Sequence, residues 1–411
     1  MERRVVITGL GAVSCAGNSV PALWKSLVAG RSGIGPITAF DGAGLPCPAG
    51  EVKDFTLTGA TPREARRMSR NTRFAVGAAK EAMEQARLTG PVPEPFRFGV
   101  LFSSGAGGVE VYDQNAEILA RRGPDGVSPF FIPKYMSNGA GGTLAIRWGL
   151  RGPNFSPVSA CASSAHAIGE GVWMIRRGDA DLMLAGGSEA CLTRLMTSGF
   201  YALTALSRTS PPEKACRPFD RGRDGFVLAE GAGALVLEEL EHAKRRGAEI
   251  IAEVAGYGSS CDGTHLTAPD PSGAGIAYAI GRAMATAGVT PEEVKAVYAH
   301  GTGTVVNDRV EARALQTVFG PVLKTVKVCA VKSMIGHALS ASGALAAVAA
   351  AQTLRTGILP PTINYANFDP ECPLDVNPSG ACRVDTRAVL IDALGFGGHN
   401  AALILKRWEG K

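Results

Sequence analysis

The chain alternates two kinds of hydrophobic segment. Alanine-rich stretches with helical spacing predict helices over 73–86, 164–176 and 342–354. Short aliphatic runs that reach a glycine predict strands, and we expect the first strand to end in a glycine turn at Gly9 and Gly11. The predicted strands cover residues 5–8, 98–102, 182–185, 234–237, 296–299 and 389–394. Strands that alternate with helices indicate an α/β fold around a largely buried sheet.

One order of segments occurs twice along the chain. FGVLFSSGAGG, VSACASSAHAIGEG and DLMLAGGSEA follow one another in the first part, and AVYAHGTGT, VKSMIGHALSASGA and ALGFGGHNAALIL follow in the second. This order predicts an internal duplication, with two similar α/β halves packed in one body of residues 1–411. We place the halves at 1–250 and 251–411. Segments 109–157 and 190–230, rich in Pro, Arg and Ser, are interpreted as insertions in the first half.

Composition excludes several classes of protein. With 45% hydrophobic and 19% charged residues the chain is not intrinsically disordered, and a net charge of +5 without a basic stripe argues against nucleic-acid binding. The longest apolar helical stretch is too short to span a bilayer, so we expect a cytoplasmic protein with no membrane contact. The nine cysteines form no CxxC pair, which predicts free thiols and no metal site.

The opening GLGAVSCAG follows a strand and suggests a dinucleotide-binding turn. Ser14 stands where the third glycine of GxGxxG would be, and no convincing acid-ended strand follows about twenty residues later. We therefore expect no nucleotide cofactor.

Cys161 is the first candidate for chemistry. It lies among small residues where an extended run turns into a helix, and the helix N-terminus favours a thiolate. On this segment alone, a small buried cysteine packed in an alanine-rich helix is the better interpretation. His300, and Lys332 with His337, occupy corresponding turns of the second part and change that balance. The backbone N–H groups of the glycine-rich run 395–400 complete the set, because they could form an oxyanion hole.

Four motifs, in chain order ACASSAHAIG, HGTGTVVNDRVE, KSMIGHALSASGA and GFGGHN, resemble those of the β-ketoacyl-[acyl-carrier-protein] synthases. The resemblance covers nearly the whole chain and is strongest to the elongating enzymes of type II fatty-acid synthesis. It implies a thiolase fold, a duplicated αβαβα five-layer body that is usually dimeric. It also implies substrates carried on the phosphopantetheine of acyl-carrier protein and no separate cofactor.

The resemblance implies a role for each catalytic residue. Cys161 would be the nucleophile that accepts the acyl group. His300 and His337 would bind the malonyl thioester oxygen and stabilise the enolate that forms when CO2 leaves. Lys332, paired with Glu311, would hold the two histidines in position.

Further residues are assigned to the substrate in the same way. The pantetheine arm would contact Thr302 and Thr304, Phe396 would be the gate between the half-reactions, and the amides of Cys161 and Phe396 would form the oxyanion hole. The remaining substrate-binding candidates are Ala106, Phe200 and Gly397. Alanine at position 106 would leave room for a long or bulky acyl chain.

A basic cluster, Arg63, Arg66 and Arg67, matches the surface that the family uses for its acidic carrier protein. The alternative is an ordinary solvated helix face.

The sequence thus predicts decarboxylative Claisen condensation of malonyl-ACP in fatty-acid elongation, by a homodimer. Gly303, His399 and the segment 369–375 depart from the elongating pattern or resemble ketosynthases of type II polyketide systems. The alternative is therefore the ketosynthase subunit of a type II polyketide or polyene pathway, which would pair with a chain-length factor in a heterodimer. A non-catalytic acyl-binding partner is disfavoured by the intact cysteine and histidines.

Overall fold

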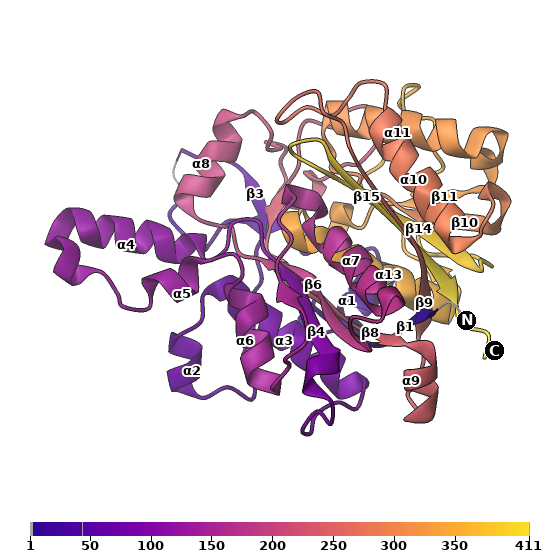
Figure 1. Cartoon of the computed structure of the whole chain (residues 1–411). Helices are drawn as coiled ribbons and strands as arrows, with labels where there is room; N and C mark the ends of the chain where they lie inside the picture. Colours follow the sequence, from indigo (N-terminus) through magenta and orange to yellow (C-terminus); the bar gives the residue numbers. More distant parts are fainter. Residues whose placement is uncertain (1–2, 43, 411) are drawn as a thin grey trace.

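The computed structural model describes residues 3–42 and 44–410. Its centre is a mixed sheet of ten strands in the order β11-β10-β14-β15-β9-β1-β8-β6-β4-β5 (Figure 1). The strands are β1 Val5–Ser14, β4 Phe98–Ser103, β5 Asn154–Phe155, β6 Leu182–Glu189, β8 Gly231–Glu239, β9 Ala252–Cys261, β10 Val294–Tyr298, β11 Lys327–Cys329, β14 Ala388–Gly395 and β15 His399–Arg407.

The sheet contains the same five-stranded arrangement twice. From its centre outward, one half runs β1-β8-β6-β4-β5 and the other β9-β15-β14-β10-β11. In each half the first two pairings are antiparallel and the last two are parallel. The halves join where β1 pairs with β9 over Val6 and Ile7. This repeat confirms the predicted duplication.

Helices form three layers around the two halves of the sheet. The middle layer is α7 (Ser163–Arg177) and α13 (Ser342–Thr356), which contact each other and strands of both halves. Residues 342–354 are buried all round, as expected for a helix enclosed on both sides. Outside the first half lie α3 (Arg70–Gln85) and α6 (Gly139–Trp148), and outside the second α10 (Ala274–Ala287) and α11 (Val305–Phe319) (Figure 1). The result is the predicted five-layer αβαβα architecture.

The first strand differs from its prediction, because β1 runs through both glycines to Ser14. A Cβ at Gly9 would lie 2.0 Å from the carbonyl oxygen of Ala82, and one at Gly11 would lie 1.8 Å from that of Ala78. The two glycines therefore let the backbone of α3 approach the strand closely. They do not make a turn, and the predicted turn is wrong.

The remaining elements surround this core. They are α1 Val20–Val28, β2 Gly35–Pro36, β3 Pro48–Gly50, α2 Pro62–Arg66, α4 Val109–Arg122, α5 Phe131–Tyr135, α8 Arg194–Ala202, β7 Leu228–Ala229, α9 Leu240–Arg245, α12 Lys332–Ile335, β12 Ile358–Leu359 and β13 Cys382–Arg383. In the segment 109–157, α4 and α5 extend from the body (Figure 1), whereas α6 and β5 belong to the outer layer and the sheet. No helix in the described part of the chain is long and apolar enough to cross a membrane.

Candidate active site

A cavity of about 600 Å³ brings together residues from both halves of the chain. Cys161 reaches it from the first half, and His300 and His337 reach it from the second. Five more of the predicted site residues line the same cavity: Ala106, Phe200, Thr302, Thr304 and Phe396. The predicted nucleophile, histidines and substrate-contacting residues therefore share one space.

Cys161 lies in a short 3₁₀ turn, Ala160–Ala162, that leads directly into α7. Ala160 has a left-handed backbone, with φ at 49°, so the chain bends sharply before the cysteine. The Ser163 hydroxyl fastens the bend, because it accepts from the Ser159 amide at 2.9 Å and donates to the Ala160 carbonyl at 2.6 Å. This strand-to-helix elbow presents the sulfur to the cavity.

The glycine-rich turn after β14 packs against this elbow. A Cβ at Gly395 would lie 2.5 Å from the Ser159 carbonyl oxygen, so only glycine fits there without a shift. The close approach lets the Phe396 amide hydrogen-bond the Cys161 sulfur, next to the amide of Cys161 itself. Two backbone donors thus converge beside the sulfur, as an oxyanion hole requires.

Burial, with a smaller contribution from the Glu189 carboxylate, raises the pKa of the Cys161 thiol to about 12. The Lys332 ammonium and the two backbone amides act in the opposite direction but are outweighed. The expectation of a thiolate, drawn from the nearby helix N-terminus, is therefore wrong for the resting site. Desolvation disfavours a charged sulfur more than the helix end and the ammonium favour it.

The two histidine rings lie edge to face, 5.3 Å apart, and both are buried. Burial lowers the pKa of His300 and of His337 well below the usual range, and the Lys332 ammonium lowers both further. Both rings are therefore neutral at physiological pH. Nδ1 of His337 lies 2.9 Å from the Ser342 hydroxyl, and Nδ1 of His300 lies 3.5 Å from the Lys332 ammonium.

Lys332 begins α12 and is fully enclosed behind the histidines. Its ammonium donates to the His300 carbonyl oxygen at 2.5 Å. The expected direct pair with Glu311 is not the geometry found, because Glu311 accepts from the Gly301 amide at 2.8 Å and from Asn307 at 3.2 Å. Burial lowers the pKa of Lys332, and the Glu311 carboxyl opposes that shift without a direct hydrogen bond. Lysine and glutamate therefore act on neighbouring parts of the same loop.

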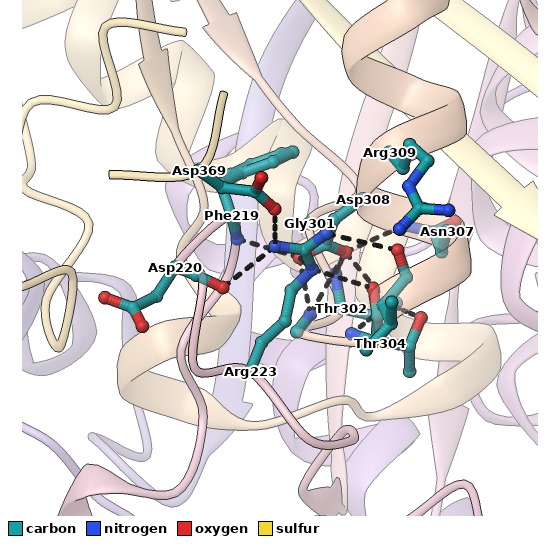
Figure 2. Close-up of polar contacts among 12 residues, drawn as sticks. Phe219, Asp220, Arg223, Gly301, Thr302, Thr304, Asn307, Asp308, Arg309 and Asp369 are labelled. Carbon is teal, nitrogen blue, oxygen red and sulfur yellow. Dashed lines mark hydrogen bonds and ion pairs between the residues drawn. The ribbon is translucent and has the colours of Figure 1, made fainter. Parts of the chain in front are cut away.

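A buried ionic cluster holds the loop that carries the two threonines (Figure 2). Asp308 accepts from the amides of Thr302 and Gly303, each at 3.2 Å. Arg223 lies 3.8 Å from Asp308 and 2.5 Å from Asp369, and it donates to the Thr304 carbonyl at 3.3 Å. The threonine hydroxyls are 2.9 Å apart at the cavity wall. Charged side chains from three segments that are far apart in the sequence thus hold the loop that carries Thr302 and Thr304.

Sequence reasoning gave no role to Arg223, Asp308 or Asp369. Asp308 lies inside the motif HGTGTVVNDRVE, Asp369 begins the segment 369–375, and Arg223 lies in neither, and all three are charged side chains that the fold buries. Buried charges require partners. Only the folded chain shows that these three are partners of one another.

The part of the cavity near Ala106 and Phe200 is mostly apolar. Glu189, buried at the end of β6, accepts from the amides of Gly105 at 3.0 Å and Ala106 at 3.2 Å and so fixes this wall. Further apolar side chains of the cavity lining include Met196, Leu203, Phe226 and Leu339. An apolar lining beside a thiol suits an acyl chain.

Six predicted residues do not line the cavity: Lys332 and Glu311, described above, and Gly397, Arg63, Arg66 and Arg67. Gly397 follows the Phe396 turn, and its amide donates to the Leu266 carbonyl at 2.7 Å. Arg63, Arg66 and Arg67 are exposed on and just after α2. A capping box between Thr61 and Glu64 starts this helix, and the Arg67 guanidinium lies over the Phe130 ring at 5.3 Å. Over 3–42 and 44–410, no cluster of His, Cys, Asp and Glu has the arrangement of a metal site.

Comparison with known proteins agrees with this geometry. The family models "Beta-ketoacyl synthase, N-terminal domain" and "Beta-ketoacyl synthase, C-terminal domain" match residues 2–243 and 251–366. The chain is 44% identical to 3-oxoacyl-[acyl-carrier-protein] synthase 2 of Staphylococcus aureus strain COL over 410 residues, covering 99% of both chains. It is also 44% identical to the Synechocystis protein of the same name over 411 residues, again covering 99% of each.

Solved structures match over nearly the whole chain. One is the ishigamide ketosynthase/chain length factor, with a TM-score of 0.91, 38% identity and coverage of 99% of this chain and 100% of the other. Another is a type II PKS acyl-carrier protein in complex with its ketosynthase bound to the hexaketide, with a TM-score of 0.90, 33% identity and the same coverage. The nucleophile elbow, the paired histidines and these full-length matches show that the chain belongs to the β-ketoacyl synthase family.

Proposed function

We propose that the protein is a β-ketoacyl-[acyl-carrier-protein] synthase that elongates fatty acyl chains by decarboxylative Claisen condensation with malonyl-ACP. The observation that carries this proposal is the single cavity in which one thiol, Cys161, faces two neutral imidazoles, His300 and His337. The 44% identity to two proteins named 3-oxoacyl-[acyl-carrier-protein] synthase 2 supports it over the full length.

In the first half-reaction Cys161 attacks the thioester of an acyl-ACP. A bond forms between its sulfur and the acyl carbon, the bond from that carbon to the pantetheine sulfur breaks, and the cysteine proton leaves with the pantetheine thiol. Negative charge develops on the acyl oxygen during attack, and the backbone N–H groups of Cys161 and Phe396, which lie beside the sulfur, would donate hydrogen bonds to this oxygen. Because the resting sulfur is protonated, deprotonation accompanies attack instead of preceding it.

In the second half-reaction the malonyl thioester occupies the histidine side of the cavity. Hydrogen bonds from Nε2 of His300 and His337 to the thioester oxygen stabilise the enolate formed as CO2 leaves. The enolate carbon attacks the acyl-cysteine, and the released sulfur takes up a proton. Neutral imidazoles suit this role. The Lys332 ammonium, which can only donate, faces Nδ1 of His300, and the Ser342 hydroxyl at Nδ1 of His337 can donate as well, so each Nε2 can carry the ring proton.

The other predicted residues fit this chemistry as binding or positioning groups. Thr302 and Thr304 would bind the pantetheine arm, and Phe396 would gate passage between half-reactions. Ala106 and Phe200 would border the acyl chain. Gly397 would fasten the turn through Leu266 without touching substrate. The substrates arrive on phosphopantetheine, so no free cofactor is assigned.

We assign acyl-carrier protein as the partner and a homodimer in the cytoplasm as the assembly. Within each chain, the two duplicated halves divide near residue 250. The likeness to the ishigamide ketosynthase/chain length factor supports one alternative, a ketosynthase subunit of a type II polyketide or polyene pathway with a chain-length factor. Native mass with and without the neighbouring gene products distinguishes the two assemblies. The length and reduction state of the acyl chain on Cys161 distinguish the pathways.

Intact-mass analysis after incubation with a set of acyl-ACPs tests the proposed reaction. The expected result is one acyl adduct on the wild type, none on Cys161→Ala, and retained acylation but lost malonyl decarboxylation in His300→Ala and His337→Ala. Full condensation by Cys161→Ala, or histidine variants that lose only acyl transfer, would contradict the assigned roles.

Carrier-protein docking has its own test. Replacing Arg63, Arg66 and Arg67 with Glu is expected to raise the KM for acyl-ACP while leaving turnover of a small thioester such as acyl-N-acetylcysteamine intact. A matched control places Glu at three exposed basic positions elsewhere, Arg87, Lys324 and Arg383. An equal rise in KM for both triple variants would show only a general effect of net charge.

A further inference from the structure

Two carboxyl groups lie behind the histidines and take part in neither half-reaction. Glu311 is on α11 and Asp392 is on β14, and both are almost completely buried. Neither lines the cavity. Burying two acids side by side is costly, so their arrangement calls for an explanation.

Each carboxyl holds one of two successive backbone amides. Oδ1 of Asp392 accepts from the His300 amide at 2.8 Å, and Oε2 of Glu311 accepts from the Gly301 amide at 2.8 Å. The other two oxygens, Oδ2 of Asp392 and Oε1 of Glu311, are buried and have no N–H or hydroxyl partner among the described residues. The two carboxyl groups are close enough for each to shift the pKa of the other. A hydrogen bond between these two oxygens needs a donor, and a carboxylate is only an acceptor.

We propose that Glu311 and Asp392 share one proton, and that the resulting pair, with a net charge of −1, positions His300 and compensates the charge of Lys332. This inference rests on the proposed function only for its effect on catalysis. The shared proton itself is a property of the folded protein.

The surrounding charges agree with a singly protonated pair. Burial raises the pKa of Asp392 to about 6 and that of Glu311 well above its usual range. The charged groups that face the pair are Lys332 on α12 and Asp308 on α11, whose own charge is compensated by Arg223. The other titratable groups of this region are His300, His337, Cys161 and Cys216.

The pair acts on catalysis through the His300 loop. It holds the amides of His300 and Gly301, while Lys332 holds the His300 carbonyl and lies at Nδ1 of the ring. One negative charge on the pair and one positive charge on Lys332 sum to zero. Without the negative charge, a buried ammonium would be uncompensated and would tend to lose its proton. Glu311 and Asp392 are therefore positioning residues.

Isosteric amides test the shared proton. Asp392→Asn and Glu311→Gln each keep a hydrogen-bond donor and one carboxylate, so each should lower malonyl decarboxylation by less than about tenfold. The double variant keeps the shape but removes the charge and should lose more than about a hundredfold, far beyond the product of the two single effects. Single effects that multiply to give the double effect would mean that the two acids act independently, which would overturn the proposal.

Infrared spectroscopy gives a readout that does not depend on activity. The wild type should show the C=O stretch of one buried protonated carboxyl, shifted by ¹³C labelling of Asp and Glu, and each single variant should lose it. Absence of this band from the wild type overturns the shared proton even if condensation proceeds as proposed. Its presence in an enzyme that does not condense malonyl-ACP would instead overturn the proposed function alone.

The pH profile of decarboxylation adds a readout that a purely structural role would not move. A group whose pKa is raised gains its proton as pH falls through that pKa. The wild-type pair should therefore lose its negative charge, and activity with it, below about pH 6. In Asp392→Asn the remaining Glu311 has an amide donor and no neighbouring acid, so the profile should move away from that of the pair and follow the pKa of Glu311 alone. An unshifted profile in a folded variant, checked by acylation of Cys161, would contradict the proposed positioning role.

Discussion

The two halves of the protein contain the same backbone elbow, but different residues occupy its equivalent positions. The turn Ala160–Ala162 precedes α7, and the turn Leu339–Ala341 precedes α13. Both turns are 3₁₀ helices whose first residue is left-handed, with φ at 49° in Ala160 and 42° in Leu339. In both a serine begins the following helix. Cys161 and Ser340 therefore occupy equivalent positions.

Their surroundings separate a reactive group from a structural one. The Cys161 side chain lines the cavity and has two backbone amides beside its sulfur. The Ser340 hydroxyl is fully buried, and it donates to Glu189 at 2.6 Å and contacts the Ser188 carbonyl at 3.2 Å. The duplicated backbone supplies the position, and the opposite half decides what that position does. The second elbow contributes to the site through Leu339 in its turn and through His337, two residues before the turn.

The largest expected effect removes the nucleophile from the first elbow. Cys161→Ala should lower condensation by more than about a thousandfold, because no other group in the cavity can carry the acyl chain. Adding Ser340→Cys should not restore it, since the second elbow faces Glu189 and not the substrate. Condensation rates with acyl-ACP and malonyl-ACP measure both, and recovery in the double variant would show that the elbows are interchangeable.

The next effect concerns the donors near the second elbow. His337→Ala or His300→Ala should each lower malonyl decarboxylation by about 10²–10³-fold, the loss usual for one donor to a developing oxyanion. Release of labelled CO2 measures this loss in the Cys161→Ala background, where condensation cannot interfere. Ser342→Ala, which leaves the ring present but frees its Nδ1, should have a smaller effect. An equal loss in that variant would assign the effect to packing instead of to the ring proton.

Local sequence was sufficient to predict the elements that the elbows join. The helices expected over 164–176 and 342–354 are found as α7 and α13. Their alanine-rich apolar residues recur with helical spacing, so a helix is the local structure that buries them together. The order of strand, loop, elbow and helix, repeated twice, also predicted the duplication. The thiol, the two histidines and the threonine loop were found in the same way, because each lies in a short motif.

The predictions that the structure contradicts depend on contacts between residues far apart in the sequence. Gly9 and Gly11 were assigned to a turn because their reason, the close backbone of α3, lies about seventy residues away. The thiolate expected at Cys161 considered the helix end but not the burial that the whole fold imposes. Asp392 received no role, since its partner Glu311 is eighty-one positions earlier.

A smaller effect sharpens the difference in ionisation. Because the pKa of Cys161 is raised to about 12, its alkylation by iodoacetamide should rise about tenfold per pH unit between pH 7 and 9 without levelling off. The sign follows from burial, which keeps the thiol protonated until pH approaches that value. Peptide mass spectrometry separates Cys161 from the exposed Cys261. A plateau near neutral pH would show that the helix end outweighs burial after all.

The smallest expected effect tests the structural role of the second elbow. Ser340→Ala removes the 2.6 Å hydroxyl donor to Oε2 of the buried Glu189, which keeps the Gly105 amide at 3.0 Å. A hydrogen bond to a carboxylate contributes about 1.5–3 kcal/mol. Urea unfolding should show that loss, whereas Cys161→Ala, which removes no strong hydrogen bond, should stay within about 1 kcal/mol of the wild type. Ser340→Thr keeps the hydroxyl and serves as the control for its loss. If both alanine variants unfold at the same urea concentration, the two elbows differ in reactivity alone, and the duplicated turn stabilises each half to the same degree.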